Sequence, residues 1–132
     1  MIYGIGTDIS DVRRFKKWVN SPELISRFFA KEELFFLEEN NKTMDAACRH
    51  YAARFAAKEA FVKALGTGFV GIELKGLWVS KNEDGKPFFS FNDKTKKILD
   101  NRIGNKYNIQ LSISHEKEYA VAFVLIEKSE DL

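Results

Sequence analysis

The sequence predicts an α+β fold in which a mainly antiparallel sheet packs against one long helix. Strand-like segments come in neighbouring pairs and do not alternate with helices, as they would in a doubly wound parallel sheet. Residues 82–85, Asn-Glu-Asp-Gly, carry a hairpin turn signal between two such segments. The longest helical segment covers residues 44–65 and ends at Gly66. We expect the order β-α-α-α-β-β-α-β-β.

The first half of the chain is expected to hold one strand and then helices. Residues 2–9 have the apolar character of a buried strand, loosened by two glycines. Ser10 is a candidate N-cap for a helix over about 11–19, and Pro22 suits the first turn of the next short helix. Helical structure is further expected over residues 31–39 and 44–65.

The second half is expected to be mostly strand. The predicted strands cover residues 72–81, 86–91, 108–114 and 119–127, with a helix over 93–103 between the two pairs. Gly104 is the expected stop of that helix, and residues 115–118 form the turn between the last two strands.

Length and composition favour one compact domain over residues 1–132. The chain is 45% hydrophobic and has 12 Phe, which is enough apolar material for a core. A net charge of +2 argues against a nucleic-acid-binding domain, since such domains are usually much more basic. Cys48 is the one cysteine, so it has no partner for an internal disulfide, and we expect it in the core. There is no secretory signal and no apolar window of about 18 residues, so we expect a soluble cytoplasmic protein.

The long helix carries charged residues among many alanines. At about 100° per residue, Glu59 and Lys63 share one face with Ala52 and Ala56. One interpretation is a surface ion pair contributing about 0.3–0.5 kcal/mol. The other is that the small alanines leave room for a ligand beside Glu59.

Two further cations, Arg54 and Lys58, lie on a different side of this helix, which ends in Gly66-Thr67-Gly68. They are either solvated or close to an anion, because cations one turn apart repel slightly. A backbone without side chains can approach a ligand closely, and cations beside it suit a phosphate.

A carboxylate among these cations favours a bound metal ion. Mg²⁺ usually takes one or two protein carboxylates and completes its shell with water and phosphate oxygens. Glu59 is one candidate ligand, and Asp8 at the end of the first strand is the second. Asp8 could instead cap a turn, and Asp11 ranks below it because it suits a cap or an exposed position.

Four motifs together resemble one family. GIGTDISDVRR begins at residue 4, RFAAKEAFVKALGTG covers 54–68, DGKP covers 84–87 and SISH covers 112–115. In this order they are similar to holo-acyl-carrier-protein synthases, the short bacterial type of 4′-phosphopantetheinyl transferase. The resemblance covers about residues 2–127, and the long middle motif is its most specific part. It implies the 4′-phosphopantetheinyl transferase fold.

The resemblance also implies an activity. Members transfer the phosphopantetheine arm of coenzyme A to a serine of apo-acyl carrier protein, release adenosine 3′,5′-bisphosphate, require Mg²⁺ and serve fatty acid biosynthesis. They are usually homotrimers with coenzyme A between subunits. The residues that match the family's functional positions are Asp8 and Glu59 for the metal, Glu59 and Lys63 for catalysis, Arg54, Lys63, Gly66, Thr67 and His115 for coenzyme A phosphates, and Lys86 and Pro87 for its adenine end.

The implied chemistry leaves some roles open. Lys63 would stabilise the departing bisphosphate or give it a proton, and the serine proton could go to Glu59 or to a metal-bound water. His115 follows an alternating strand, so a half-buried structural histidine is an alternative for it. Glu116 departs from the Thr or Ser that the family often has there. His50 is expected to be an ordinary helical residue.

The basic first helix predicts a partner surface. Arg13, Arg14, Lys16 and Lys17 crowd it, which is either a solvated face or a surface that steers the acidic carrier protein. By resemblance, Arg14 and Arg27 contact the carrier protein; Phe28 or Trp18 could add an apolar contact, although both also suit the core. The alternatives to the transferase are a nucleic-acid-binding module that stacks bases on phenylalanines and a coenzyme A-binding scaffold without turnover.

Overall fold

The computed structural model describes residues 1–37, 43–68 and 71–129. Its strands and helices follow the predicted order, and the predicted α+β class is confirmed. The elements are β1 (Ile2–Asp11), α1 (Phe15–Val19), α2 (Pro22–Phe28), α4 (Met44–Leu65), β2 (Leu77–Lys81), β3 (Pro87–Phe91), α5 (Asp93–Ile103), β4 (Tyr107–His115) and β5 (Tyr119–Lys128). Short 3-10 turns cover Val12–Arg14, Lys31–Glu33 and Leu74–Gly76.

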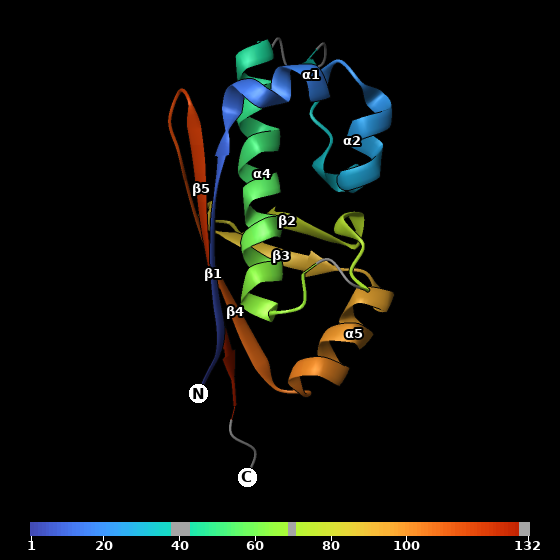
Figure 1. Cartoon of the computed structure of the whole chain (residues 1–132), viewed down its shortest axis with the longest axis vertical. Helices are drawn as coiled ribbons and strands as arrows, with labels where there is room; N and C mark the ends of the chain where they lie inside the picture. The colour runs from blue at the N-terminus through green and yellow to red at the C-terminus, as the bar shows by residue number, and fades with distance from the viewer. Residues whose placement is uncertain (38–42, 69–70, 130–132) are drawn as a thin grey trace.

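The strands form two antiparallel sheets, and both contact α4. One sheet has the order β1-β5-β4, and the other is the β2–β3 hairpin. Figure 1 shows the three-stranded sheet on the left, α4 in the middle, the hairpin crossing behind α4, and α2 and α5 on the right. The strand β5 separates the two edge strands, so that Asp8 of β1 pairs with Ala122 and His115 of β4 with Ala120.

Small residues allow α4 to pack closely against β1. A Cβ atom added to Gly4 would lie 1.8 Å from the carbonyl oxygen of Ala64, and one added to Gly6 would lie 1.9 Å from that of Ala60. Any larger residue at these glycines would therefore push the helix away from the strand. Together, Gly4, Gly6 and the alanines of the helix determine how closely α4 packs against β1.

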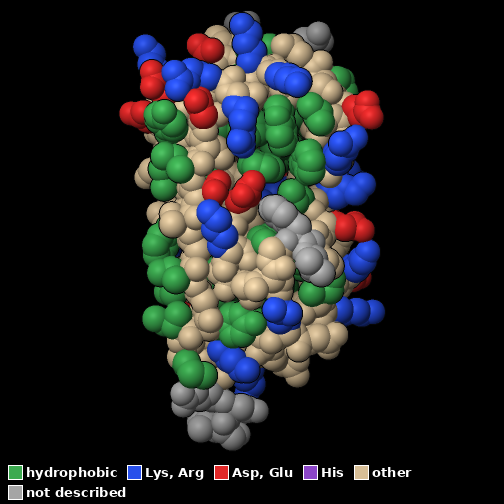
Figure 2. All heavy atoms as spheres, viewed as in Figure 1, with side chains coloured by type: hydrophobic (Ala, Val, Ile, Leu, Met, Phe, Trp, Pro, Cys, Tyr) green, Lys and Arg blue, Asp and Glu red, His purple; other side chains and the backbone are tan. Residues whose placement is uncertain are grey.

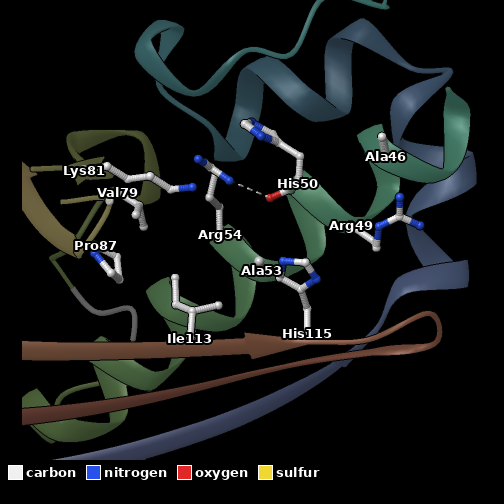
Figure 3. A pocket seen from close by; sticks show the side chains of 11 residues that line it. Ala46, Arg49, His50, Ala53, Arg54, Val79, Lys81, Pro87, Ile113 and His115 are labelled. Atoms are coloured by element: carbon white, nitrogen blue, oxygen red, sulfur yellow. Dashed lines mark hydrogen bonds between the residues drawn. The ribbon is translucent and has the colours of Figure 1, made fainter. Parts of the chain in front are cut away.

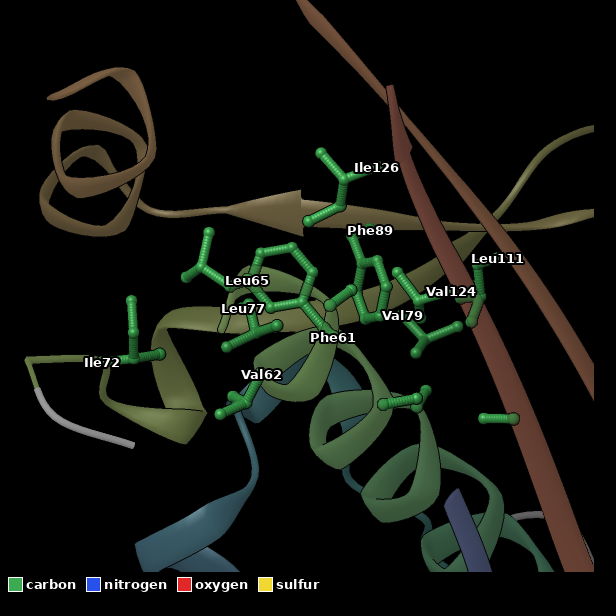
Figure 4. Packing of buried hydrophobic residues seen from close by; sticks show 14 of the residues in the cluster. Phe61, Val62, Leu65, Ile72, Leu77, Val79, Phe89, Leu111, Val124 and Ile126 are labelled. Carbon is green, nitrogen blue, oxygen red and sulfur yellow. The ribbon is translucent and has the colours of Figure 1, made fainter. Parts of the chain in front are cut away.

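Two apolar clusters fill the space around α4. The larger one joins the C-terminal half of the helix to both sheets and includes Phe61, Leu77 and Val124, each with no exposed surface (Figure 4). The smaller one joins the N-terminal half to α1 and α2 and contains Phe15. Cys48 lies in this second cluster, as expected.

Side-chain caps begin the helices where the sequence has hydroxyl or amide residues. Ser21 accepts from Leu24 N in front of α2, Thr43 accepts from Ala46 N in front of α4, and Asn92 accepts from Thr95 N in front of α5. Gly66 ends α4 with a φ of 84°, a left-handed conformation that glycine adopts without strain.

Three local predictions are wrong. The strand expected over 72–81 begins only at Leu77, because Leu74–Gly76 form a 3-10 turn. Ser10 does not cap a helix, because β1 continues to Asp11, whose carboxylate accepts from Arg13 N at 2.9 Å and caps the following turn. The expected continuous helix over 31–39 is interrupted: Lys31–Glu33 form a 3-10 turn, Leu34 is extended, and Leu37 is helical again. Phe35 N instead donates to the Tyr51 hydroxyl at 2.8 Å, so a tertiary contact replaces the helical hydrogen bond. Residues 38 and 39 lie outside the described residues.

Candidate functional site

Asp8, Glu59 and Lys63 come together where β1 lies against α4. The ammonium of Lys63 donates to the Oδ1 of Asp8 at 3.2 Å and to the carbonyl oxygen of Thr7 at 3.0 Å. Glu59 lies one helical turn before Lys63 on the same face, and the charge of Asp8 acts on its carboxylate. Figure 2 shows two acidic side chains close together in the middle of one face, with a basic side chain beside them.

The local backbone explains why these three side chains meet. Asp8 lies on the same side of β1 as Gly4 and Gly6, which face the helix. The hydroxyl of Ser10, the next residue on that side, donates to the Oδ2 of Asp8 at 3.4 Å. The close packing of β1 on α4 therefore brings Asp8 of the strand near Glu59 of the helix, although Glu59 lies 51 positions later in the chain.

The environment of Glu59 makes its carboxylate a better proton acceptor than an exposed one. Burial raises the pKa of Glu59, and the charge of Asp8 raises it further. Lys63 and Arg14 oppose this by attracting the charged form. Because the carboxylates of Asp8 and Glu59 repel each other, a cation bound near them would stabilise the pair.

The residues present fit a magnesium ion. Asp8 and Glu59 offer only oxygen atoms, which Mg²⁺ prefers, and the expected number of protein carboxylates is one or two. Within the described residues, no group of three or more His, Cys, Asp or Glu side chains could hold a metal. A pair of carboxylates beside a ligand phosphate suits Mg²⁺, whereas zinc sites favour His and Cys. Asp11 is not part of this pair, because it is bound to Arg13 at 2.9 Å.

The end of α4 lies one turn beyond Lys63 and presents an open backbone. A Cβ added to Gly66 would meet no atom within 4 Å. The hydroxyl of Thr67 donates to the carbonyl oxygen of Gly68 at 2.7 Å. Lys63, Gly66 and Thr67 thus form one group with Asp8 and Glu59, which we call the carboxylate half-site.

Arg54, Pro87 and His115 lie elsewhere, around a pocket of about 330 Å³. Figure 3 shows Arg54 projecting from α4, Pro87 from β3 and His115 from the end of β4. We call this pocket the cationic half-site. Two further basic residues that no sequence motif indicated, Arg49 and Lys81, also line it. Arg49 precedes the recognised motif, and Lys81 lies in β2 opposite Pro87, so only pairing in the hairpin could have indicated it.

The guanidinium of Arg54 is held in place but not fully bonded. Its Nη1 donates to the carbonyl oxygen of His50 at 3.3 Å, whereas its Nε is buried without a hydrogen-bond partner. Burial lowers the pKa of Arg54. A buried N–H without an acceptor is costly, and a ligand oxygen would satisfy it.

Two residues beside this pocket do not line it. Lys86 donates through its ammonium to the Oε1 of Gln110 at 3.3 Å, so its proposed contact with adenine stays a prediction. Glu116 is exposed in the turn after His115 and is not among the lining residues.

The two half-sites lie on opposite sides of α4. Lys63 follows Arg54 by nine residues, which corresponds to about 180° around the helix and about 13 Å along it. Asp8 and His115 lie on the two edge strands, with β5 between them. The body of the helix therefore stands between the two half-sites of one chain.

Two expectations about α4 are corrected. Ala52 and Ala56 have no exposed surface and belong to the apolar clusters, so the alanines make room for the sheet and not for a ligand. Lys58 is also fully buried and forms an ion pair with Glu33. Its ammonium donates to the carbonyl oxygens of Phe28 at 2.9 Å and Leu74 at 2.7 Å. Lys58 is therefore a structural cation.

An apolar groove of about 510 Å³ lies beside the carboxylate half-site. Trp18, Phe28 and Phe55 line it, with ring centroids 5.2 Å apart in the pairs Trp18–Phe28 and Trp18–Phe55. Phe55 lies one helical turn before Glu59. Arg27 lies at its rim.

Arg14 links the same region to the carboxylates. Its guanidinium lies 5.7 Å from the ring centre of Phe55, and its charge acts on Glu59. The exposed side chain of Arg27 forms an ion pair of 3.7 Å with Glu23. We call the groove with Arg14 and Arg27 the docking groove.

None of the helices in the described residues is both long and apolar enough to span a membrane.

Comparison with known proteins gives a consistent picture. The family model of the 4′-phosphopantetheinyl transferase superfamily matches residues 4–124. The chain is 46% identical over 127 residues to a holo-[acyl-carrier-protein] synthase of Treponema denticola, covering 96% of this chain and 99% of that protein. It is 43% identical over 130 residues to the enzyme of that name from Clostridium botulinum, covering 96% and 98%.

Solved structures with the same fold carry the same name. The structure of holo-[acyl-carrier-protein] synthase from Neisseria meningitidis has a TM-score of 0.80 and 34% identity, covering 97% of this chain and 100% of that one. A synthase from Bacillus anthracis, in complex with CoA (3′,5′-ADP), has a TM-score of 0.76 and 32% identity, covering 98% and 99%.

Proposed function

Because the chain belongs to the 4′-phosphopantetheinyl transferase superfamily, we propose that it moves the 4′-phosphopantetheine arm of coenzyme A to a serine of apo-acyl carrier protein. The other product is adenosine 3′,5′-bisphosphate, the reaction depends on Mg²⁺, and it serves fatty acid biosynthesis in the cytoplasm. The meeting of Asp8, Glu59 and Lys63 from β1 and α4 carries this proposal. The relatives' name and the coenzyme A complex of the Bacillus anthracis synthase support it.

The reaction exchanges one phosphorus–oxygen bond for another. The serine hydroxyl attacks the phosphorus that carries pantetheine, and the bond from that phosphorus to the bridging oxygen breaks. Adenosine 3′,5′-bisphosphate leaves with the bridging oxygen. Enzymes accelerate such transfers mainly by positioning the reactants and neutralising charge. Lys63 is the cation that would stabilise the leaving group, and Arg54 and His115 would hold its nucleotide end.

Asp8 and Glu59 would hold the magnesium ion, which supplies positive charge to the pyrophosphate oxygens when it is bound. Glu59 would also be the carboxylate that takes the proton of the serine hydroxyl. Ser10 keeps Asp8 in place through its hydrogen bond to Oδ2. Gly66 leaves the backbone open to the phosphates.

We propose that the working enzyme is a homotrimer with its sites between subunits. The two half-sites of one chain lie on opposite sides of α4, so one coenzyme A can contact both types only if a second copy supplies one of them. Such a head-to-tail arrangement closes into a ring, as a trimer does.

The outer face of the three-stranded sheet supports self-association. Ile5 and Ile9 of β1 are 58% and 62% exposed, and Val121 and Phe123 of β5 are 39% and 44% exposed. In Figure 2 hydrophobic side chains line the left edge of the molecule, where β1 and β5 lie in Figure 1. An exposed apolar stripe of this kind is typical of an interface.

The docking groove would bind the carrier protein. Its rings offer an apolar contact, and Arg14 and Arg27 offer cations to an acidic partner. Because Phe55 and Glu59 are one turn apart, a protein bound there presents its serine next to the carboxylates.

Arg14→Glu tests this surface. Reversing the charge should raise the KM for carrier protein at least tenfold and leave the KM for coenzyme A within about twofold. Lys97→Glu on α5, away from the groove, is the control. Equal effects of Arg14→Glu on both KM values would contradict the docking role.

Mass spectrometry of apo-acyl carrier protein tests the activity itself. After incubation with the protein, Mg²⁺ and coenzyme A, the carrier protein should gain one phosphopantetheine arm. Glu59→Gln, Asp8→Ala and EDTA should each reduce the gain by at least about a hundredfold, because each removes charge neutralisation from the transition state. Undiminished transfer by Glu59→Gln would refute the role of Glu59, and absence of any gain with the unaltered protein would refute the activity.

A further inference from the structure

Glu33 is a buried carboxylate to which the proposed reaction gives no role. Its side chain has 1% of its surface exposed and forms an ion pair with Lys58. Its Oε1 also accepts a hydrogen bond from Ala30 N at 3.1 Å, and its Oε2 accepts one from Val79 N at 3.3 Å. Both oxygens are therefore bonded to groups other than those of the candidate site, and the place of this negative charge is fixed.

The charge of Glu33 also acts on Arg54. Burial lowers the pKa of Arg54, and the carboxylate of Glu33 opposes this by favouring the charged guanidinium. The ion pairs between described residues nevertheless do not include Arg54. Glu33 therefore stabilises the guanidinium as a nearby charge, and it leaves the Nε of Arg54 without a partner.

The main chain of Glu33 is connected to the same guanidinium through His50. The Nε2 of His50 donates to the carbonyl oxygen of Glu33 at 2.6 Å. The carbonyl oxygen of His50 in turn accepts from the Nη1 of Arg54 at 3.3 Å (Figure 3). Glu33 thus acts on Arg54 both through its charge and through two successive contacts.

Without this carboxylate, the guanidinium would be a buried cation close to another one. The charge of Arg54 acts on Lys58 and lowers its pKa, so the two cations repel each other. Removing the charge of Glu33 takes away the anion that opposes this repulsion. A guanidinium is then better solvated outside the pocket, where it would no longer meet a phosphate bound inside.

Building on the proposed function, we propose that Glu33 is a positioning residue, which holds the guanidinium of Arg54 in the cationic half-site without bonding to it. A carboxylate paired directly with Arg54 would compete with a phosphate for the same N–H groups. Glu33 does not compete, because Lys58 and two backbone N–H groups occupy its oxygens. Glu33 then influences coenzyme A binding only through Arg54.

A double-mutant cycle tests this dependence. Isothermal titration calorimetry measures coenzyme A binding by the full-length protein, by Glu33→Gln, by Arg54→Gln and by the variant that carries both substitutions. Glu33→Gln should weaken binding about fivefold or more when Arg54 is present. In the Arg54→Gln background it should weaken binding by less than about twofold, because the group through which it acts is gone.

A second variant covers the case in which Glu33→Gln does not fold, since this substitution leaves Lys58 buried without its anion. Circular dichroism identifies that case. The combination Lys58→Met, Glu33→Gln then replaces Glu33→Gln in both arms of the cycle, because it leaves no member of the pair charged. The same expectation holds for it: at least fivefold with Arg54 present and less than twofold without.

Two controls separate positioning from general damage. Asp100→Asn on α5 also removes a carboxylate from an ion pair with a lysine, Lys96, and should change coenzyme A affinity by less than about twofold. Phe29→Leu removes part of a buried ring that lies 5.0 Å from the ammonium of Lys58. It reduces packing in the same neighbourhood and removes no charge, so it should also stay within about twofold.

The positioning role is overturned if the Glu33 substitution weakens binding equally with and without Arg54, because that result assigns its effect to the structure in general. Unchanged or tighter binding in the presence of Arg54 overturns it as well, and so does a fivefold loss with Phe29→Leu. In each of these cases, transfer to the carrier protein by the unaltered protein leaves the proposed function standing. Failure of the unaltered protein to bind coenzyme A overturns the proposed function together with this inference.

Discussion

His50 is held as a neutral imidazole inside the protein. Its Nε2 lies 2.6 Å from the carbonyl oxygen of Glu33, and because a carbonyl can only accept, His50 donates. Burial first, and then the charges of Arg54 and Lys81, together lower the pKa of His50 to about 4 against the opposing effect of the hydrogen bond to Glu33. The ring also contacts Phe35 and Tyr51, with centroids 4.8 Å and 5.0 Å apart.

This histidine predicts a loss of stability in mild acid. The unfolded chain binds a proton near pH 6.5 and the folded chain only near pH 4, so the free energy of unfolding falls as the pH drops through this window. Between pH 6.5 and pH 5 the loss should be about 2 kcal/mol. Urea unfolding of the protein and of His50→Phe measures it, since the variant keeps an aromatic ring and cannot titrate. Identical pH dependence of the two proteins would contradict the prediction.

The site residues differ in how far the sequence could predict them. Asp8, Glu59 and Lys63 belong to dense motifs, so the resemblance to the family was enough to predict them. Arg49 and Lys81 lie outside those motifs and line one pocket only because the β2–β3 hairpin packs near α4. For Lys58 the sequence left a solvated side chain or a nearby anion open, and the structure shows that the anion is the buried Glu33, because helical periodicity gives the side of the helix and not what packs there.

At the scale of elements, α4 is joined to its neighbours by the buried ion pair of Lys58 and Glu33. Lys58 bonds the end of α2 at Phe28 and the turn at Leu74. Glu33 accepts from Ala30 N at 3.1 Å and from Val79 N at 3.3 Å, which connects the same point to β2. Phe28 and Leu74 also line the docking groove, so the hydrogen bonds of Lys58 hold two of the residues that form its wall.

Removing only one partner of the Lys58–Glu33 ion pair should lower the free energy of unfolding. Lys58→Met leaves a buried carboxylate without its cation and should lower the free energy of unfolding by about 3–5 kcal/mol. The double variant Lys58→Met, Glu33→Gln should be more stable than Lys58→Met, because no buried charge is left alone. Urea unfolding compares them.

The exposed ion pair of Lys94 and Glu73, with side chains 67% and 54% exposed, provides the control. Lys94→Met should cost less than about 1 kcal/mol. A cost for Lys58→Met no larger than this would mean that the buried pair contributes little.

For the whole molecule, the decisive question is whether one active site uses two chains. If it does, Arg54→Gln and Lys63→Ala should each abolish transfer, because each destroys one half of every site. Co-expressed in one cell, the two variants should recover about a quarter of the parental activity, since random mixing pairs one intact half of each kind at that frequency. The phosphopantetheine gain of the carrier protein measures the recovery.

Two controls accompany this experiment. Lys63→Ala with Glu59→Gln combines two defects in the same half-site and should recover nothing. Phe123→Lys places a charge on the exposed sheet face and should shift the protein toward its monomer mass of 15.2 kDa, with loss of transfer. Recovery by the first control, or full activity of a Phe123→Lys monomer, would contradict sites between subunits.

The sequence by itself determined the α+β class, the order of the elements, the helix from 44 to 65 and the family. These follow from local periodicity, from turn and cap residues and from motif order, all of which depend only on residues close together in the sequence or on their order. The tertiary structure decided that the alanines of α4 face the sheet, that Lys58 is buried, and that Arg54 and Lys63 lie in separate half-sites. The physical reason is that these facts depend on what packs against each side of a helix, and the partners are strands and turns remote in the chain.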